Sequence, residues 1–230
     1  MFFIVLMRTE GLYAVACIPA YNEAASIGDV IDRCRRYVDV VVVCDDGSKD
    51  DTTRISESLD ADVVRHIHNL GYGAALRSLF SRARRLEPEY LVTLDADGQH
   101  EPSDIPKLLS LLEGGEYDVV IGTRFHDHEE DKIDTFRRWG IRVVTWLINR
   151  YGYGVSDAQS GFRAYNRRAY TGIEIRENGM GASLDLFFQA KKLGLRIGET
   201  PIKVSPERRR RGSLVSHGVK LLYTYLRHLF

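Results

Sequence analysis

Two aspartates, Asp95 and Asp97, follow the largely apolar run 90–94 with a single residue, Ala96, between them. Residues i and i+2 of an extended segment point the same way, so both carboxylates can converge on one hard cation. The carbonyl of Gln99 would supply a third oxygen ligand for Mg²⁺ or Mn²⁺. Such a cation neutralises the charge that develops on a nucleoside diphosphate as it leaves a sugar. The pattern predicts a metal site for diphosphates; the alternative is a solvated turn after a strand.

Two other polar loops also follow apolar runs. The run 13–18 leads into the segment 19–23, Pro-Ala-Tyr-Asn-Glu, and the run 40–44 leads into Asp45-Asp46-Gly47-Ser48. Pro19 could simply end a strand, and the aspartates before Gly47 could form an ordinary turn. If the strands are parallel, however, these loops lie at the same sheet edge as Asp95, which predicts a nucleotide-sized crevice there.

The elements that must position these loops alternate along the chain. We predict strands at 13–18, 40–44, 63–66, 90–94 and 117–121, and helices at 23–37, after residue 51, at 71–85 and at 102–113. Strand–helix alternation predicts an α/β fold with a mostly parallel central sheet flanked by helices, which binds ligands at the carboxyl ends of its strands.

The motifs together resemble the inverting glycosyltransferases of family 2, which have the GT-A fold, and especially their polyprenyl-phosphate (dolichol-phosphate) hexose synthase branch. The resemblance covers nearly the whole chain. Its motifs are Pro19-Ala20-Tyr21-Asn22-Glu23, Asp45-Asp46-Gly47-Ser48, Asn69-Leu70-Gly71-Tyr72-Gly73, Asp95-Ala96-Asp97-Gly98-Gln99, Gly122-Thr123-Arg124-Phe125 and Asp157-Ala158-Gln159-Ser160-Gly161-Phe162-Arg163.

The resemblance implies a nucleotide-sugar site and a metal site. The nucleotide-sugar residues would be Pro19, Ala20, Tyr21, Asn22, Glu23, Asp45, Asp46, Gly73, Asp95, Ala96 and Asp97, with Gly73 acting through packing at a helix start near the ligand. The metal ligands would be Asp95, Asp97 and Gln99, and the cofactor Mg²⁺ or Mn²⁺.

Arginines supply the expected acceptor site. Arg138 and Arg142 lie four residues apart on a predicted helix, so they share a face on which guanidinium groups can clasp a phosphate. The resemblance implies that Arg124 and Arg138 bind the acceptor phosphate, although some relatives have a hydroxyl residue at the position of Arg142. A solvated basic helix face is the alternative, above all for Arg137.

Asp157 and Gln159 complete the predicted catalytic residues. A hydroxyl acceptor must lose a proton and needs a base, for which Asp157 is the leading candidate, whereas a phosphate monoester is already anionic and mainly needs orientation. With a phosphate acceptor, Asp157 would orient the sugar or help to anchor the metal site. Asp157 could also merely cap a turn.

Composition limits the partners and the compartment. Lys and Arg together number 32, as do Asp and Glu, so net charge gives no reason to expect a nucleic-acid partner. Cys17, Cys34 and Cys44 are odd in number and widely spaced, which is typical of reduced thiols in the cytoplasm.

Residues 206–230 differ from the rest of the chain because they contain a cluster of arginines near their start. We expect residues 1–205 to form the catalytic domain and 206–230 to form a basic loop, which contains Arg208 to Arg211, and an amphipathic helix. A basic run before such a helix can bind an anionic membrane, which predicts peripheral attachment at its cytoplasmic face. A packed terminal helix is the alternative.

The sequence thus predicts metal-dependent, inverting transfer of a hexose from a nucleotide sugar to dolichyl or polyprenyl phosphate. GDP-mannose, UDP-glucose and UDP-N-acetylglucosamine are all possible donors. Two other functions stay open: transfer to a hydroxyl acceptor, such as a polysaccharide or a lipid-linked sugar, and nucleotide-sugar binding without catalysis.

Overall fold

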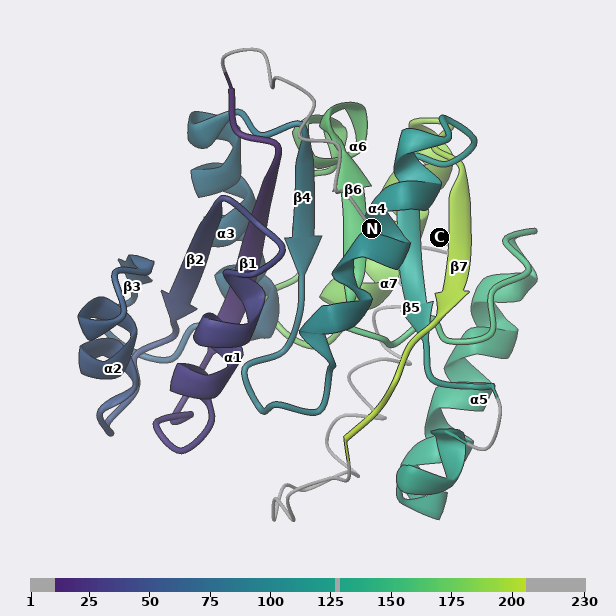
Figure 1. The fold of residues 1–230 in the computed structure, drawn as a ribbon. Coiled ribbons are helices and arrows are strands. Elements are labelled where there is room, and N and C mark those ends of the chain that lie inside the picture. The colour runs from purple at the N-terminus through teal and green to yellow at the C-terminus, as the bar shows by residue number, and fades with distance from the viewer. Residues whose placement is uncertain (1–10, 127–128, 206–230) are drawn as a thin grey trace, which may run out of the picture.

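One sheet organises the part of the chain, residues 11–126 and 129–205, that the computed structural model describes. Its strand order is β3-β2-β1-β4-β6-β5-β7 (Figure 1). Only β6 runs antiparallel to its neighbours, β4 and β5. The strands are β1 (Ala14–Ala20), β2 (Val40–Asp45), β3 (Asp62–Arg65), β4 (Tyr90–Thr93), β5 (Val119–Thr123), β6 (Arg163–Asn166) and β7 (Ile197–Pro201). The predicted α/β fold with a mostly parallel sheet is confirmed.

Helices cover both faces of the sheet. They are α1 (Ile27–Cys34), α2 (Thr52–Ser58), α3 (Tyr72–Leu86), α4 (Ile105–Glu113), α5 (Thr135–Asn149), α6 (Arg167–Gly172) and α7 (Ala182–Lys192), with 3₁₀ turns η1 (Pro102–Asp104) and η2 (Glu129–Lys132). Side chains of α1 and α4 join the core on one face, and those of α3, α6 and α7 join the core on the other. A third cluster packs α5 against α7.

Hydrophobic spacing explains these elements. Ile27, Val30, Ile31 and Cys34 of α1 are buried and recur at three- and four-residue intervals, as one face of a helix requires. Strands β1 and β2 are almost wholly buried, because helices cover the sheet on both sides. Continuous apolar runs are therefore the expected pattern for these strands, and the predicted elements up to residue 121 are present, with ends shifted by a few residues.

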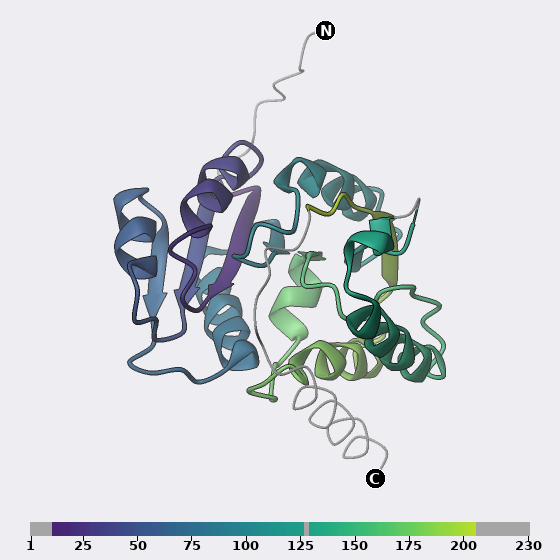
Figure 2. The same cartoon turned by 90° about the horizontal axis from the view of Figure 1, so that it is seen from below.

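The parallel strands all end at one edge of the sheet, the lower edge in Figure 1, which Figure 2 views from below. The loops after β1, β2 and β4 therefore share that edge, as the sequence predicts. No helix within the described ranges is long and apolar enough to cross a bilayer. The predicted basic loop and helix at 206–230 lie outside the described residues.

The start of α3 packs unusually tightly against the loop that precedes α7. The backbone N–H groups of Gly73 and Ala74 both donate to the Asn178 carbonyl, at 2.7 and 3.2 Å. A Cβ atom added to Gly73 would lie only 1.9 Å from the Glu177 carbonyl oxygen and 2.8 Å from the Cβ of Ala182. Only glycine fits here without moving backbone.

We therefore expect Gly73→Ala to lower the free energy of unfolding by about 3 kcal/mol, because the added methyl group meets backbone that cannot simply rotate away. Gly140→Ala is the matched control: Gly140 lies within α5 and has no atom within 4 Å of its added Cβ. That change should stabilise the protein by about 0.5–1 kcal/mol. Urea unfolding curves measure both; equal effects of the two changes would contradict this account.

Candidate functional site

A cavity of about 510 Å³ opens at the carboxyl edge of the sheet. It is lined by residues from the loops after β1, β2 and β4, from the start of α3 and from the loop before α7. These are Pro19, Ala20, Tyr21, Glu23, Asp46, Asn69, Gly71, Tyr72, Ala75, Asp95, Ala96, Asp97, Gly179 and Met180. Eight of the predicted nucleotide-sugar residues thus share one cavity, because parallel strands bring their following loops together.

Asn22, by contrast, joins two loops instead of lining the cavity. Its backbone N–H donates to Ser48 Oγ at 2.8 Å, and its side-chain oxygen accepts from the Lys49 N–H at 2.8 Å. Asn22 adopts a φ of 56°, a left-handed conformation that asparagine tolerates better than most residues. It therefore holds the first loop against the second.

Asp45 and Asp46 are neighbours with different roles. Asp45 is fully buried, accepts the Ser48 N–H at 2.9 Å and hydrogen-bonds to the Thr53 hydroxyl, so it braces its own turn. Asp46 lines the cavity and accepts the backbone N–H groups of Leu70 and Gly71 at 2.9 and 2.8 Å. Asp46 thereby holds the loop before α3 at the cavity wall.

His66 supports this arrangement, although no sequence motif singles it out. Its Nδ1 lies 2.7 Å from Asp46 Oδ1, and its Nε2 lies 2.9 Å from Ser78 Oγ on α3. Only the fold brings the end of β3, the second loop and α3 together, so sequence reasoning had no signal with which to find His66.

Asp95 and Asp97 both face the cavity. Asp97 Oδ1 accepts the backbone N–H of Gln99 at 3.0 Å, which closes the turn after β4. Gly161 lies directly behind Asp95: an added Cβ there would be 2.5 Å from Asp95 Oδ1. The Thr93 hydroxyl donates to the Gly161 carbonyl at 2.9 Å and so ties β4 to the loop before β6.

His100 lies beneath the two aspartates and is only 2% exposed. Its Nδ1 accepts the backbone N–H of Asp95 at 3.2 Å. Burial, reinforced by the positive charge of Arg124, lowers the pKa of His100 to about 4. The imidazole is therefore neutral at neutral pH and acts here as a hydrogen-bond acceptor that orients the start of the turn.

The two carboxylates suit a hard divalent cation. Burial and the negative charge of Asp95 raise the pKa of Asp97, as expected for two carboxylates held close together. Within residues 11–126 and 129–205, no group of three or more His, Cys, Asp or Glu side chains is arranged for a metal. A cation held by these two aspartates would therefore draw further ligands from elsewhere, and diphosphate oxygens are the ligands it prefers.

Gln99, the predicted third ligand, does not line the cavity. Its backbone carbonyl accepts the N–H of Ser205 at 2.9 Å. The role of Gln99 as a metal ligand stays a prediction.

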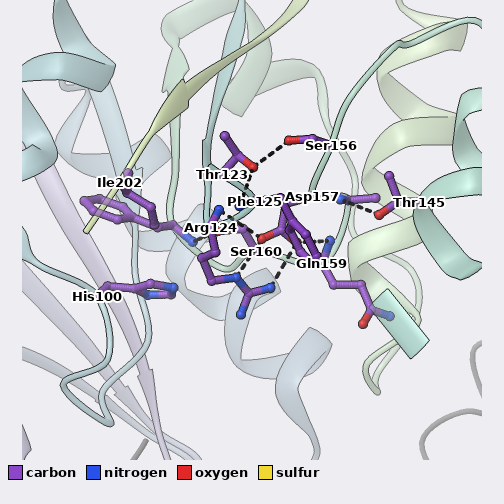
Figure 3. A network of polar contacts seen from close by, with 12 residues as sticks. His100, Thr123, Arg124, Phe125, Thr145, Ser156, Asp157, Gln159, Ser160 and Ile202 are labelled. Atoms are coloured by element: carbon purple, nitrogen blue, oxygen red, sulfur yellow. Dashed lines mark hydrogen bonds and ion pairs between the residues drawn. The ribbon is translucent and has the colours of Figure 1, made fainter. Parts of the chain in front are cut away.

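Arg124 and Asp157 form a buried ion pair (Figure 3). Arg124 Nε lies 2.6 Å from Asp157 Oδ2, and Nη2 lies 2.9 Å from Oδ1, so the contact is bidentate. Burial alone would raise the pKa of Asp157, but the charge and hydrogen bonds of Arg124 outweigh it, and the pKa lies below its usual value. Asp157 is an ionised anchor for Arg124.

Further backbone contacts fix this pair. The Gln159 N–H donates to Asp157 Oδ1 at 3.3 Å, which links these two predicted catalytic residues. Glu199 on β7 accepts the N–H groups of Ser156 and Asp157 at 2.7 and 3.0 Å. Glu199 lies more than 40 residues further along the chain, so the sequence did not indicate it.

The structure gives Arg138 and Arg142 different surroundings from Arg124. Arg138 Nη1 forms an ion pair with Asp131 Oδ1 at 2.7 Å, and the Arg142 guanidinium lies over the Phe125 ring, 5.6 Å from its centroid. Arg138 and Arg142 share one flank of α5, as predicted, while Arg124 is held at the end of β5. The acceptor-phosphate role of Arg124 and Arg138 stays a prediction.

The fold and the site together define a GT-A type α/β protein. The crystal structure of glucosyl-3-phosphoglycerate synthase from Mycobacterium tuberculosis, in complex with Mn²⁺, UDP and glucosyl-3-phosphoglycerate, superposes with a TM-score of 0.73 at 23% identity. The match covers 94% of this chain and 80% of that chain. At this identity the likeness concerns the fold.

The chain belongs to glycosyl transferase family 2, whose profile matches residues 15–173, and it is a glycosyltransferase. It is 31% identical to the UDP-N-acetylglucosamine–dolichyl-phosphate N-acetylglucosaminyltransferase of Methanococcus voltae, over 91% of this chain and 93% of that protein. It is 35% identical to the dolichyl-phosphate hexose transferase of Haloferax volcanii, over 84% of this chain and 81% of that protein. The predicted family is thereby confirmed.

We expect Asp157→Asn to lower the free energy of unfolding by about 3–5 kcal/mol, because it leaves the buried Arg124 charge without an ionised partner. A cycle of four proteins compares the unchanged chain with Arg124→Met, with Asp157→Leu and with the double variant, and the double change should cost less than the sum of those two single changes. Urea unfolding of the four proteins measures this coupling.

Asp51→Asn is the control, because Asp51 forms an exposed ion pair with Arg54 and should barely affect stability. Since the pKa of Asp157 is lowered on folding, its stabilising effect is present above the ordinary carboxyl pKa and is lost as the pH falls through the lower folded value. Strict additivity of the two single changes would contradict the pairing.

Proposed function

We propose that this enzyme transfers a hexose, with inversion, from a nucleotide sugar to a polyprenyl or dolichyl phosphate in the presence of Mg²⁺ or Mn²⁺. The observation that carries the proposal is that Asp95 and Asp97 face the same cavity as the loops after β1 and β2. Names of relatives support the lipid phosphate: the Methanococcus and Haloferax proteins are both dolichyl-phosphate sugar transferases.

The residues that line the cavity suggest how the nucleotide-sugar donor binds. Pro19, Tyr21 and Glu23 on one side, with Asp46 holding the opposite loop, form the pocket for the nucleoside. Next to this pocket, Asp95 and Asp97 would bind the diphosphate through the cation, and the predicted third protein ligand is Gln99. When bound, the cation supplies Lewis-acid stabilisation of the departing nucleoside diphosphate. Neutral His100 keeps the backbone of Asp95 in place for this role.

The ion pair between Arg124 and Asp157 favours a phosphate acceptor over a hydroxyl acceptor. A general base must be able to take up a proton, but both oxygens of Asp157 accept hydrogen bonds from Arg124, and its pKa is lowered. A phosphate monoester is already anionic and needs no such base. Asp157 then serves to hold Arg124 in place, and Arg124 and Arg138 orient the acceptor phosphate.

The reaction is a single displacement. An oxygen of the acceptor phosphate attacks the anomeric carbon, the bond from that carbon to the diphosphate breaks, and the configuration at the carbon inverts. The protein contributes orientation and charge stabilisation, and no covalent enzyme intermediate is needed.

To test the metal site, Asp95→Asn and Asp97→Asn are assayed with labelled nucleotide sugars and a short polyprenyl phosphate, with extraction of the product into organic solvent. We expect each change to lower kcat/KM by about 10²–10³-fold, since stabilisation of the leaving diphosphate is lost. A chelator should abolish transfer by the unchanged enzyme, and Mg²⁺ or Mn²⁺ should restore it.

Asp29→Asn, at an exposed carboxylate of α1, is the matched control and should leave kcat/KM unchanged. Full activity of both cavity variants, or with excess chelator, would refute the metal site. Product that stays in the aqueous phase and forms only with hydroxyl acceptors would instead favour a polysaccharide or sugar acceptor.

Arg138→Gln tests the acceptor site separately. Because Arg138 is predicted to hold the acceptor phosphate, its loss should raise the KM for polyprenyl phosphate about tenfold and leave the dissociation constant of the donor unchanged. Arg138→Lys should recover only part of the loss, because lysine keeps the charge without the two-pronged geometry. Arg85→Gln, at an exposed arginine of α3, is the control; an equal effect there would exclude a specific role for Arg138.

A further inference from the structure

A second cavity, of about 430 Å³, lies between α3 and the segment 173–181, which leads from α6 to α7. The residues that line it are Arg77, Phe80 and Arg84 from α3, and Glu174, Ile175 and Arg176 from the segment. Its volume falls within the range of about 300–1,000 Å³ that is typical of small-molecule sites. None of its lining residues has a part in the proposed reaction, so this cavity calls for a separate explanation.

The charge of this cavity is mainly positive. Arg77 and Arg84 are two helical turns apart, so they share one face of α3, and Phe80 lies between them on that face. Arg176 adds a third positive charge from the opposite wall, and Glu174 is the one carboxylate among the lining residues. Three guanidinium groups against one carboxylate favour an anionic ligand. We call this site the arginine cavity.

The two arginines on α3 are oriented by neutral oxygen atoms. Arg77 Nη1 donates to the Ile175 carbonyl at 3.2 Å, and its Nη2 donates to Asn178 Oδ1 at 2.7 Å. Arg84 donates through Nε and Nη2 to two backbone carbonyls near the end of α6. Across residues 11–126 and 129–205, neither guanidinium group forms an ion pair with a carboxylate. These contacts direct both side chains without neutralising their charges.

The opposite wall combines a fixed backbone with an adjustable side chain. The Arg176 N–H donates to Asp185 Oδ2 at 2.7 Å, and Asp185 is fully buried in α7. The Arg176 guanidinium instead pairs with Glu174 at 3.1 Å, and both of these side chains are more than 60% exposed. Such an exposed pair contributes little free energy, so an anion in the cavity can replace Glu174 as the partner of Arg176.

We propose that the arginine cavity binds a small organic phosphate, a soluble phosphate monoester. Guanidinium groups bind phosphate oxygens through paired hydrogen bonds, and they also stack on flat rings. A phosphate monoester carries close to two negative charges, which suits three arginines opposed by one carboxylate. The cavity volume far exceeds that of a bare phosphate ion, so the organic part of the ligand occupies the remainder.

The arginine cavity and the donor cavity share a wall. Gly179 and Met180, at the end of the same segment, line the donor cavity. Arg77 holds the Asn178 side chain, and the Asn178 carbonyl accepts the N–H of Gly73 at the start of α3. A phosphate that recruits Arg77 removes this support from the shared wall, so it weakens donor binding. This consequence alone rests on the proposed function, because it requires a nucleotide in the donor cavity.

Isothermal titration of the full chain with phenyl phosphate tests the site. We expect saturable binding at millimolar concentration, and Arg77→Gln with Arg84→Gln should weaken it about tenfold or more, because two phosphate-binding groups are lost. Arg85→Gln is the matched control, since Arg85 is an exposed arginine of α3 that does not line the cavity. Inorganic phosphate should bind more weakly than phenyl phosphate; equal affinity for the two overturns the assignment of an organic phosphate.

Glu174→Gln gives a test that a damaged fold cannot imitate. It removes the one carboxylate of the cavity and releases Arg176, so phenyl phosphate should bind about threefold more tightly. Glu57→Gln, at an exposed carboxylate of α2, should leave the affinity unchanged. Unchanged or weaker binding by the Glu174 variant overturns the proposal, as does the absence of binding to the unchanged protein.

Arg138→Gln locates the bound phosphate. Because Arg138 is predicted to bind the acceptor phosphate elsewhere, this change should leave the affinity for phenyl phosphate in the arginine cavity unaltered. If binding is lost in Arg138→Gln and kept in Arg77→Gln with Arg84→Gln, the phosphate occupies the predicted acceptor site, and the proposal is wrong.

The coupling between the cavities is measured with UDP and GDP in the presence of Mg²⁺. Phenyl phosphate should raise the dissociation constant of the nucleotide about fivefold and then reach a plateau, since both ligands are bound together. Arg77→Gln with Arg84→Gln should abolish the effect. A constant that does not change, or that rises without a plateau as in direct competition, overturns the coupling. Binding of neither nucleotide counts against the proposed function alone, because the titration with phenyl phosphate is independent of it.

Discussion

The close approach of two carboxylates at the end of β4 is the constraint on which the site depends. Burial and the negative charge of Asp95 both raise the pKa of Asp97, so the two carboxylates repel each other. The surroundings hold them together nevertheless: the Gln99 N–H closes the turn, His100 accepts the Asp95 N–H, and Gly161 leaves just enough room behind Asp95. A divalent cation would relieve this repulsion, so a rigid turn is what the proposed metal site requires.

Several polar side chains in and around the cavity hold its loops and side chains in place. Asp46 fixes the loop before α3, Asn22 joins the first two loops, and Asp157 holds Arg124. Asp46 and Asp157 are buried, and the exposed Asn22 is hydrogen-bonded to the second loop through its backbone and its side chain. The site is thereby preorganised, as the proposed displacement requires, since its rate would depend on the alignment of a phosphate with the anomeric carbon.

Helix α5 carries Arg138, which is predicted to bind the acceptor phosphate. Its inner face packs on the domain, one flank bears Arg138 and Arg142, and its outer face exposes two tryptophans. An enzyme that joins a water-soluble donor to a lipid phosphate must work at the boundary between water and membrane.

Local patterns in the amino-acid sequence were enough to predict the alternation of strands and helices through residue 121 and the three loops at one edge, because these depend on hydrophobic period and on where each strand ends. It did not separate Asp45, which braces a turn, from Asp46, which lines the cavity, since adjacent residues carry the same chemistry. It also missed the antiparallel insertion of β6 between β4 and β5, the support of Asp157 by Glu199, and the contact of His66 with Asp46. These contacts are visible in the folded structure alone, because each joins segments that are distant along the chain. No local sequence pattern specifies which buried charged groups will pair.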